Sequence, residues 1–139
     1  MVGQMRDTPH RLVNPPELEP PIGFSHAVVA GPGATIHLGG QTGRRGDGDF
    51  GKGLVEQFDQ ACANVVTALA AAGGEPGHLV SVQIFTTDAE SYRSHARELG
   101  DAWRRHLGRH YPAVSLFEVG RLFESDALVE VVAVAVLPA

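Results

Sequence analysis

The feature that most limits how this chain can fold is its last apolar segment, residues 128–137, which reads LVEVVAVAVL. Nine of its ten residues are apolar and half are valine, a composition that favours a β-strand. A strand that is apolar at successive positions is typically buried on both of its faces. We therefore expect residues 128–137 to form a sheet strand with a covering layer on each side.

The rest of the sequence alternates between strand and helix patterns. Strands are predicted at 26–30, 35–40, 78–87 and 112–119, and helices are predicted from Leu54 to the Gly73-Gly74 pair and from Asp88 to about Leu107. The turn Gly31-Pro32-Gly33 should join the first two strands as a hairpin. The predicted order is ββαβαββ, an α+β fold in which right-handed crossovers place both helices on the same face of one sheet.

This arrangement leaves one face of the sheet without a covering layer. With 139 residues the chain fits a single domain, so no second domain is available to cover that face. We therefore expect another copy of the chain to pack against it. Residues 1–21 contain Pro15, Pro16, Pro20 and Pro21 and are predicted to be an extended leader, so that residues 22–139 form the domain.

Charge and cysteine content exclude several classes of function. The formal net charge of −5 argues against general binding to nucleic acids or anionic membranes. A local basic run, residues 104–110, is interpreted as a solvated helix face. The single Cys62 lies on an apolar helix stripe and excludes an intramolecular disulfide. Because no signal-like or membrane-spanning apolar segment is present, we expect a cytoplasmic protein.

Two short motifs resemble cofactor or metal sites without completing them. Residues 46–52 match the spacing of a phosphate-binding loop, but Gly53 stands where serine or threonine would hold magnesium. His106 and His110 have the spacing of a metal pair, but Gly108 interrupts the helix between them and no third ligand is evident. We therefore expect neither a metal nor a cofactor.

One carboxylate stands out as a functional candidate. Glu130 is the only acidic residue in the apolar run 128–137, and lone carboxylates in apolar surroundings gather at functional sites. Burial would allow it to act as a general base or acid near neutral pH. The alternative is a structural glutamate that faces solvent or forms an ion pair with another subunit. Glu118 has similar surroundings, and for it we favour a structural role.

Four segments together resemble the Rid (reactive intermediate deaminase, YjgF-like) family. They are residues 23–27 (GFSHA), residues 39–41 (GGQ), the helix positions Asn64, Leu69 and Ala72-Gly73, and the C-terminal run YPAVSLFEVGRL with LVEVVAVAV. The resemblance covers roughly residues 21 to 137. It implies a chorismate-mutase-like fold and a barrel-like homotrimer with small-molecule clefts between subunits.

The resemblance also implies an activity that needs no metal or cofactor. Well-studied members hydrolyse enamines and imines to 2-oxo acids and ammonia. Their water-holding glutamate is matched by Glu130, and the turn that lines their pocket is matched by Gly39, Gly40 and Gln41. Their pocket tyrosine, carboxylate-binding arginine and cysteine fall on Phe24, Val114 and Leu116, and Ser115 lies between the last two.

The departures from the family pattern change the expected substrate. Valine cannot replace the two-pronged grip of a guanidinium on a carboxylate, so Val114 predicts a substrate other than the usual 2-imino acids, neutral or differently charged. Arg97 or Arg121 would be the replacement if a positive charge is retained. His26 is either a substitute for the lost tyrosine hydroxyl or an ordinary hydrogen-bonded residue.

Two interpretations of the function of this chain stay open at this stage. The chain is either an imine or enamine deaminase or a non-catalytic trimer that binds a ligand or partner with the same fold. The older family label, a translation-inhibiting endoribonuclease, fits poorly with a net charge of −5.

Overall fold

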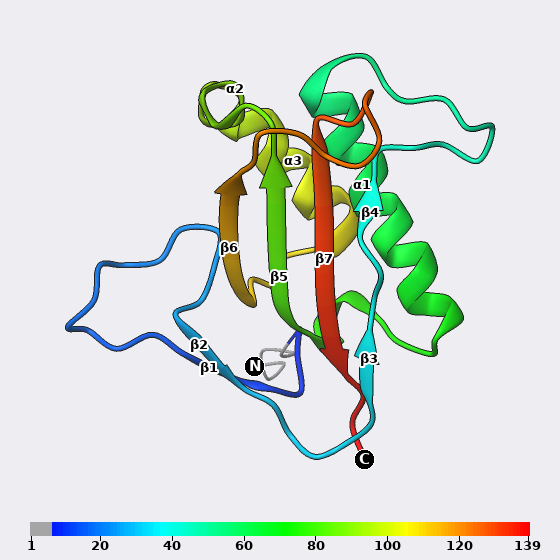
Figure 1. Cartoon of the computed structure of the whole chain (residues 1–139). Helices are drawn as coiled ribbons and strands as arrows, with labels where there is room; N and C mark the ends of the chain where they lie inside the picture. Colours follow the sequence, from blue (N-terminus) through cyan, green and yellow to red (C-terminus); the bar gives the residue numbers. More distant parts are fainter. Residues whose placement is uncertain (1–6) are drawn as a thin grey trace.

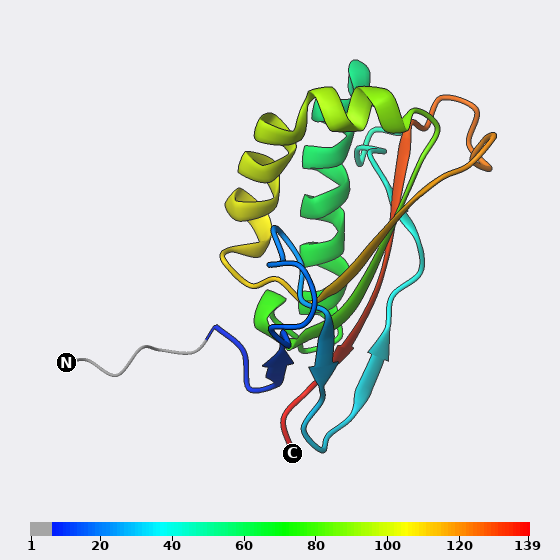
Figure 2. The same ribbon diagram turned by 90° about the vertical axis from the view of Figure 1, so that its left-hand side faces the viewer.

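The structure is a computed structural model that describes residues 7–139, and it contains one main sheet with helices on one face (Figures 1 and 2). The strands of this sheet are β3 (Thr35–His37), β4 (Gln41–Thr42), β5 (Leu79–Thr86), β6 (Ala113–Glu118) and β7 (Val129–Val136). The helices are α1 (Gly53–Ala71), the short 3-10 helix η1 (Pro76–His78), α2 (Ala89–Ser94) and α3 (Ala96–Leu107). The predicted α+β class is confirmed.

The apolar C-terminal strand β7 occupies the middle of the sheet. The strand order is β3-β7-β5-β6, and β4 also pairs with β7. Alternate residues of β7 point to opposite faces, and Val129, Val131, Ala133 and Ala135 are buried in the core beneath the helices. Glu130, Val132 and Val134, whose side chains point to the opposite face, are only half-buried. One face of β7 is therefore covered within the chain and the other is open.

Parallel pairing of β5 with β6 follows from the crossover between them, which carries α2 and α3. The sequence predicted one helix here, but the helix is interrupted at His95. The His95 ring nitrogen Nδ1 lies 2.7 Å from the Ser91 carbonyl oxygen, which also accepts the His95 backbone N–H. The predicted cap at Asp88 is confirmed, since its side chain accepts a hydrogen bond from the Ser91 N–H.

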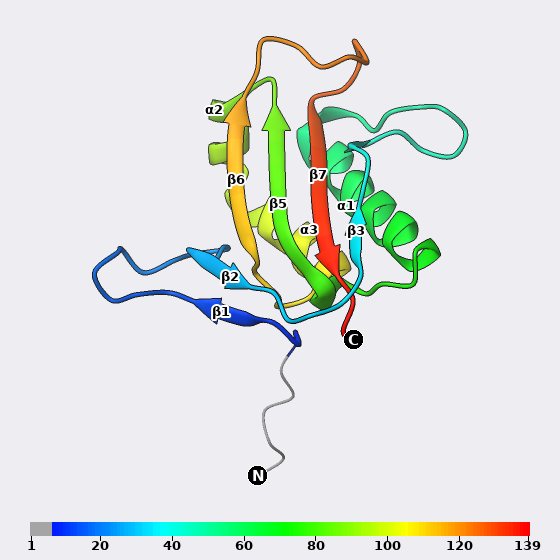
Figure 3. The ribbon, with the colours of Figure 1, turned by 60° about the horizontal axis from the view of Figure 1, so that its bottom comes forward.

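The N-terminal hairpin was predicted wrongly. Strand β2 (Ala27–Val29) pairs antiparallel with β1 (Arg11–Val13), and these two strands form a separate small sheet. Gly31, in the predicted turn, donates its N–H to Nδ1 of the buried His10, whose Nε2 bonds to the Val136 carbonyl. The leader thus supplies the partner of β2. Figure 3 shows β1 and β2 beside the lower ends of β5 and β6.

The strand predicted at 35–40 is also divided. It forms β3 and β4, and the residues between them follow β7 through a hydrogen bond from the Leu38 N–H to the Ala133 carbonyl. Residues 1–6 of the predicted leader lie outside the described part of the chain. Within residues 7–139, no helix combines the length and the hydropathy needed to cross a membrane.

The helices bury a continuous apolar core against the sheet. Phe58, Val65 and Leu69 of α1 meet Trp103 and Leu107 of α3 in this core. Cys62 is buried among them as predicted, and burial raises the pKa of its thiol to about 12. The thiol is therefore protonated at neutral pH and is a packing group instead of a nucleophile.

Candidate functional site

The predicted site residues lie in two groups on opposite faces of the main sheet. Glu130 pairs with Phe85, which in turn pairs with Phe117, so these three side chains share the open face. Val114 and Leu116 pair with Val82 and Ile84, which are buried on the helix face. One copy of the chain therefore does not bring Glu130 together with Val114 or Leu116.

The Glu130 carboxylate lies against the backbone at Gly40 and occupies the space that a side chain there would fill. A Cβ atom on Gly40 would lie 2.1 Å from Oε2 of Glu130 and 2.8 Å from its Cδ, so the carboxylate rests directly on the Gly40 backbone. Gly39 and Gln41 flank this contact, and the Gln41 side-chain amide donates to the Gly39 carbonyl at 3.2 Å. The structure thus brings Gly40 against Glu130, whereas Gln41 pairs with Val131, the neighbour of Glu130 that faces the core.

Glu130 is half-buried in the single chain, so the burial expected from the sequence is incomplete. The neighbouring open face is apolar. Phe85 and Phe117 stack with ring centroids 5.4 Å apart, and Val132 lies along the same strand face as Glu130. An adjoining molecule on this face would bury the carboxylate further.

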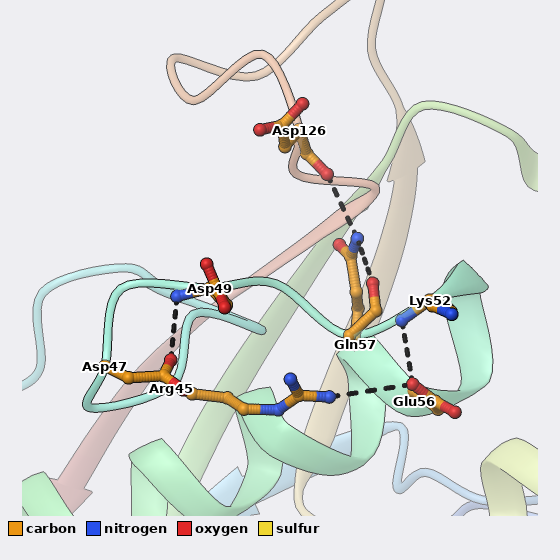
Figure 4. A network of polar contacts seen from close by, with 8 residues as sticks. Arg45, Asp47, Asp49, Lys52, Glu56, Gln57 and Asp126 are labelled. Carbon is orange, nitrogen blue, oxygen red and sulfur yellow. Dashed lines mark hydrogen bonds and ion pairs between the residues drawn. The ribbon is translucent and has the colours of Figure 1, made fainter.

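A hydrogen-bond network fixes the start of β7 and hence the position of Glu130 (Figure 4). The buried Gln57 on α1 donates from Nε2 to the carbonyls of Gly51 and Asp126, at 3.1 and 3.0 Å. Its Oε1 accepts from the Leu128 N–H at 2.8 Å. These bonds tie the loop before α1 and the turn before β7 to one side chain.

Gln57 is a functional position that was not predicted from the sequence. The signal was available, since a glutamine stands among Leu54, Phe58 and Ala61 on the apolar stripe of the first helix. A buried polar side chain at such a position must find hydrogen-bond partners, which here are backbone groups of two loops.

The second group lines a pocket of about 490 Å³ on the helix side of β6. Three predicted residues, Phe24, Val114 and Leu116, contribute to its wall. The remaining wall residues are mostly apolar or aromatic: Ile22, Gly23, Phe58, Ile84, Tyr92, Ala96, Leu99, Gly100, Trp103, Arg104 and Tyr111. The pocket suits an apolar or aromatic ligand.

Neither arginine suggested from the sequence lines this pocket. Arg97 and Arg121 are exposed, on α3 and after β6 respectively, and do not line the pocket. Arg104 does line it, although 41% of its side chain is exposed. Arg104 belongs to the basic run interpreted as a solvated helix face. Its guanidinium is charged, because hydrogen bonding to Tyr111 and then to Asp101 raises its pKa above the ordinary value.

His26 supports the pocket from behind Phe24. Its ring lies edge-on to the Phe24 ring at 5.1 Å and hydrogen-bonds to the Glu19 carbonyl at 2.8 Å. Its backbone N–H donates to Oδ1 of Asn14. These bonds fit the ordinary structural interpretation of His26. Ser115 is exposed on the open face, so it lies away from its neighbours Val114 and Leu116.

Glu118 has a structural partner. Its Oε1 accepts a hydrogen bond from the Ala89 N–H at the start of α2, at 2.9 Å. His106 bonds to Asp59 and His110 bonds to the Leu79 carbonyl, so the two histidines serve different contacts. Across residues 7–139, no group of three or more His, Cys, Asp or Glu side chains is placed to hold a metal ion.

Comparison with known proteins identifies the family. The family model described as endoribonuclease L-PSP matches residues 16–137. The Rid-family protein YyfB from Yersinia pestis, of unknown function, is 30% identical over 92% of this chain and 98% of its own, with a TM-score of 0.82. A YjgF/YER057c/UK114 family member from Mycobacterium tuberculosis is 28% identical over 92% and 99%, with a TM-score of 0.62.

A more distant structure shares the fold alone. The YjgF gene product of Escherichia coli is 24% identical over 88% of this chain and 92% of its own, with a TM-score of 0.67. No curated protein matches the chain. The family model spans nearly the whole sequence, and the solved relatives share its sheet and helices. The chain therefore belongs to the Rid/YjgF family, the family of the endoribonuclease L-PSP model.

Proposed function

We propose that this protein is an imine or enamine deaminase that works as a homotrimer, with its reaction sites between subunits. The observation that carries the proposal is the Glu130 carboxylate resting on the Gly40 backbone. A carboxylate so placed can hold a water molecule and act as a general base, and the neighbouring turn offers backbone groups to the ligand.

The proposed reaction requires only water and a mobile proton. Water held by Glu130 attacks the imine carbon, and the carboxylate accepts the proton that the water loses. That proton passes to the nitrogen and gives an amino alcohol. Glu130 then accepts the hydroxyl proton and delivers it to the same nitrogen as the carbon–nitrogen bond breaks, so that a carbonyl compound and ammonia leave. Glu130 is regenerated as the carboxylate, so the atoms and charges balance without a cofactor.

The division of the candidate residues supports sites between subunits. Glu130 and Gly40 lie on the open face of the sheet, whereas Phe24, Val114 and Leu116 line the pocket on the helix side. Only a second copy can place its pocket next to Glu130. The apolar open face around Phe85, Phe117 and Val132 supplies a surface for that packing.

The pocket wall supports a substrate other than the usual small 2-imino acids. Val114 and Leu116 present apolar side chains where the family arginine and cysteine are expected from the resemblance. A cavity of about 490 Å³ with several aromatic side chains favours an imine with a large apolar body over one as small as 2-iminopropanoate.

The test follows imine loss with an amino-acid oxidase as the source of imine. We expect wild type to accelerate loss of the phenylalanine-derived imine more than that of the alanine-derived imine. Glu130→Gln should remove the acceleration, because an amide cannot accept the proton, by a factor of about a hundred or more. Glu98→Gln, an exposed glutamate on α3, is the matched control and should behave as wild type.

Two results would contradict the deaminase proposal. Full activity in Glu130→Gln would exclude the assigned base. An inert wild type combined with gain of activity on the alanine-derived imine in Val114→Arg would favour the alternative, a trimer that binds a ligand or partner without catalysis. That alternative is supported by Phe24 and Val114, because their side chains lack the hydroxyl and the guanidinium of the family pattern.

A further inference from the structure

A single cation lies in the wall of an otherwise apolar pocket. Among the lining residues in the described part of the chain, Arg104 is the only charged one. It stands on α3, not on β6 where the resemblance places the arginine of the family. Val114 on β6 is a valine in the same wall, so the pocket has a guanidinium that enters from a different element.

Gly100 makes room for this guanidinium. A Cβ atom at position 100 would lie 3.3 Å from Nη1 and 3.5 Å from Nη2 of Arg104. A contact of 3.3 Å is tighter than most real Cβ contacts, so a side chain at position 100 would require the guanidinium to shift slightly. Glycine inside a helix costs about 1 kcal/mol relative to alanine, and the position of Arg104 supplies a reason for it.

Asp101 orients the Arg104 guanidinium and leaves several of its N–H donors without a partner among the described residues. Its Nη2 donates to Oδ1 of Asp101 at 2.6 Å, and the side chains of Tyr111 and then Asp101 raise the pKa of the guanidinium. Tyr111 in turn stacks on Trp103, with ring centroids 6.2 Å apart. A guanidinium has five N–H donors in a planar fork, so these contacts leave donors that can receive a carboxylate.

We propose that Arg104 is the carboxylate-binding and specificity-determining residue of the pocket, which takes aromatic or large apolar carboxylic acids. The aromatic wall, including Phe24 and Trp103, receives the apolar body, and the guanidinium receives the acid group. This inference rests on the proposed function for its location, because the pocket forms half of the proposed reaction site. It narrows the substrate class to imines with a carboxylate and an aromatic or large apolar body.

The experiment measures equilibrium binding by calorimetry, so it does not depend on turnover. The two probes are phenylpyruvate and phenylacetone, which share the ring and ketone and differ in the carboxylate. We expect wild type to bind phenylpyruvate at least about tenfold more tightly than phenylacetone. In Arg104→Gln that preference should vanish through weaker binding of phenylpyruvate, while phenylacetone binding stays the same. Arg104→Lys should restore part of the preference.

Arg93→Gln is the matched control, because Arg93 is an exposed arginine on α2 that pairs with Glu90 and does not line the pocket. It should keep the wild-type preference. The inference is overturned if wild type does not prefer the acid, including the case in which it binds neither probe. It is also overturned if Arg104→Gln keeps the preference or if Arg93→Gln loses it.

Imine turnover, measured separately, distinguishes the two proposals. Arg104-dependent binding of phenylpyruvate by a protein that does not hydrolyse imines would overturn the deaminase proposal and leave this inference standing. Hydrolysis of the phenylalanine-derived imine with an unchanged KM in Arg104→Gln would overturn this inference alone.

Discussion

Glu130 lies in close contact with Gly40, and this contact forms the part of the proposed site that holds the general base. The carboxylate occupies the space that a side chain at position 40 would fill. The role of glycine here is to leave space for the carboxylate and not to allow a special backbone conformation, since the Gly40 φ lies outside the left-handed region. The family resemblance pointed to both residues, but only the structure gives the contact between them.

Gly40→Ala should displace the carboxylate without unfolding the chain. The atom that the new Cβ meets is the far end of a flexible side chain, so Glu130 can rotate away at little cost in stability. We expect imine turnover to fall at least about tenfold, while the midpoint of thermal unfolding changes little. Gly46→Ala, in the exposed loop before α1 with open space around it, is the control and should match wild type. Wild-type turnover in Gly40→Ala would contradict the assigned contact.

Helix and strand types were largely predictable from the sequence, whereas pairing partners were not. The apolar periodicity of α1 and the valine-rich β7 fixed their types, because burial alone produces those patterns. The partner of β2 was missed, because β1 is only three residues long and lies among prolines. The break at His95 was missed, because the apolar stripe continues through it.

Arg104 was overlooked for a related reason. A charge run on a helix is usually solvated, and the neighbouring Arg105 is paired with Asp59 on the surface. The run is exposed at Arg104 as predicted, but the sequence does not state which of its members also lines the pocket. Gly100, four residues earlier on α3, was the available signal, because a glycine inside a helix usually serves close packing.

The connection from α3 to β6 is sensitive to acid through His110. The buried ring donates from Nε2 to the Leu79 carbonyl at 2.8 Å, and its Nδ1 has no hydrogen-bond partner in the described part of the chain. Burial is the main cause that lowers the pKa of His110 below the ordinary value for histidine, and the bond to Leu79 partly opposes it. The neutral ring is therefore the form that the fold accommodates.

Because the pKa of His110 is lower in the folded chain, its contribution to stability is present above the unfolded value and is lost as the pH falls through the folded value. We expect the free energy of unfolding to decrease below about pH 6.5, with a slope from this group of up to about 1.4 kcal/mol per pH unit. Urea unfolding between pH 8 and pH 5 measures it. His110→Gln should show a shallower decrease, and an equal slope in both proteins would exclude His110 as the cause.

At the scale of the whole molecule, the candidate residues form two groups on opposite faces of one sheet. Glu130 lies on the open face, and Leu116 and Arg104 line the pocket on the helix side. The sequence predicted an uncovered sheet face and hence a partner, because two helices cover only one side. It did not predict that the candidate residues divide between the faces, since that depends on strand register.

The most direct test of this account mixes two inactive variants. Glu130→Gln removes the base, and Leu116→Trp fills the pocket, so each homo-oligomer should be inactive toward the phenylalanine-derived imine. After equimolar co-refolding, sites that join the intact pocket of one variant to the intact Glu130 of the other should restore about a quarter of the wild-type rate. A mixture as inactive as either parent, alongside an active wild type, would contradict sites shared between subunits.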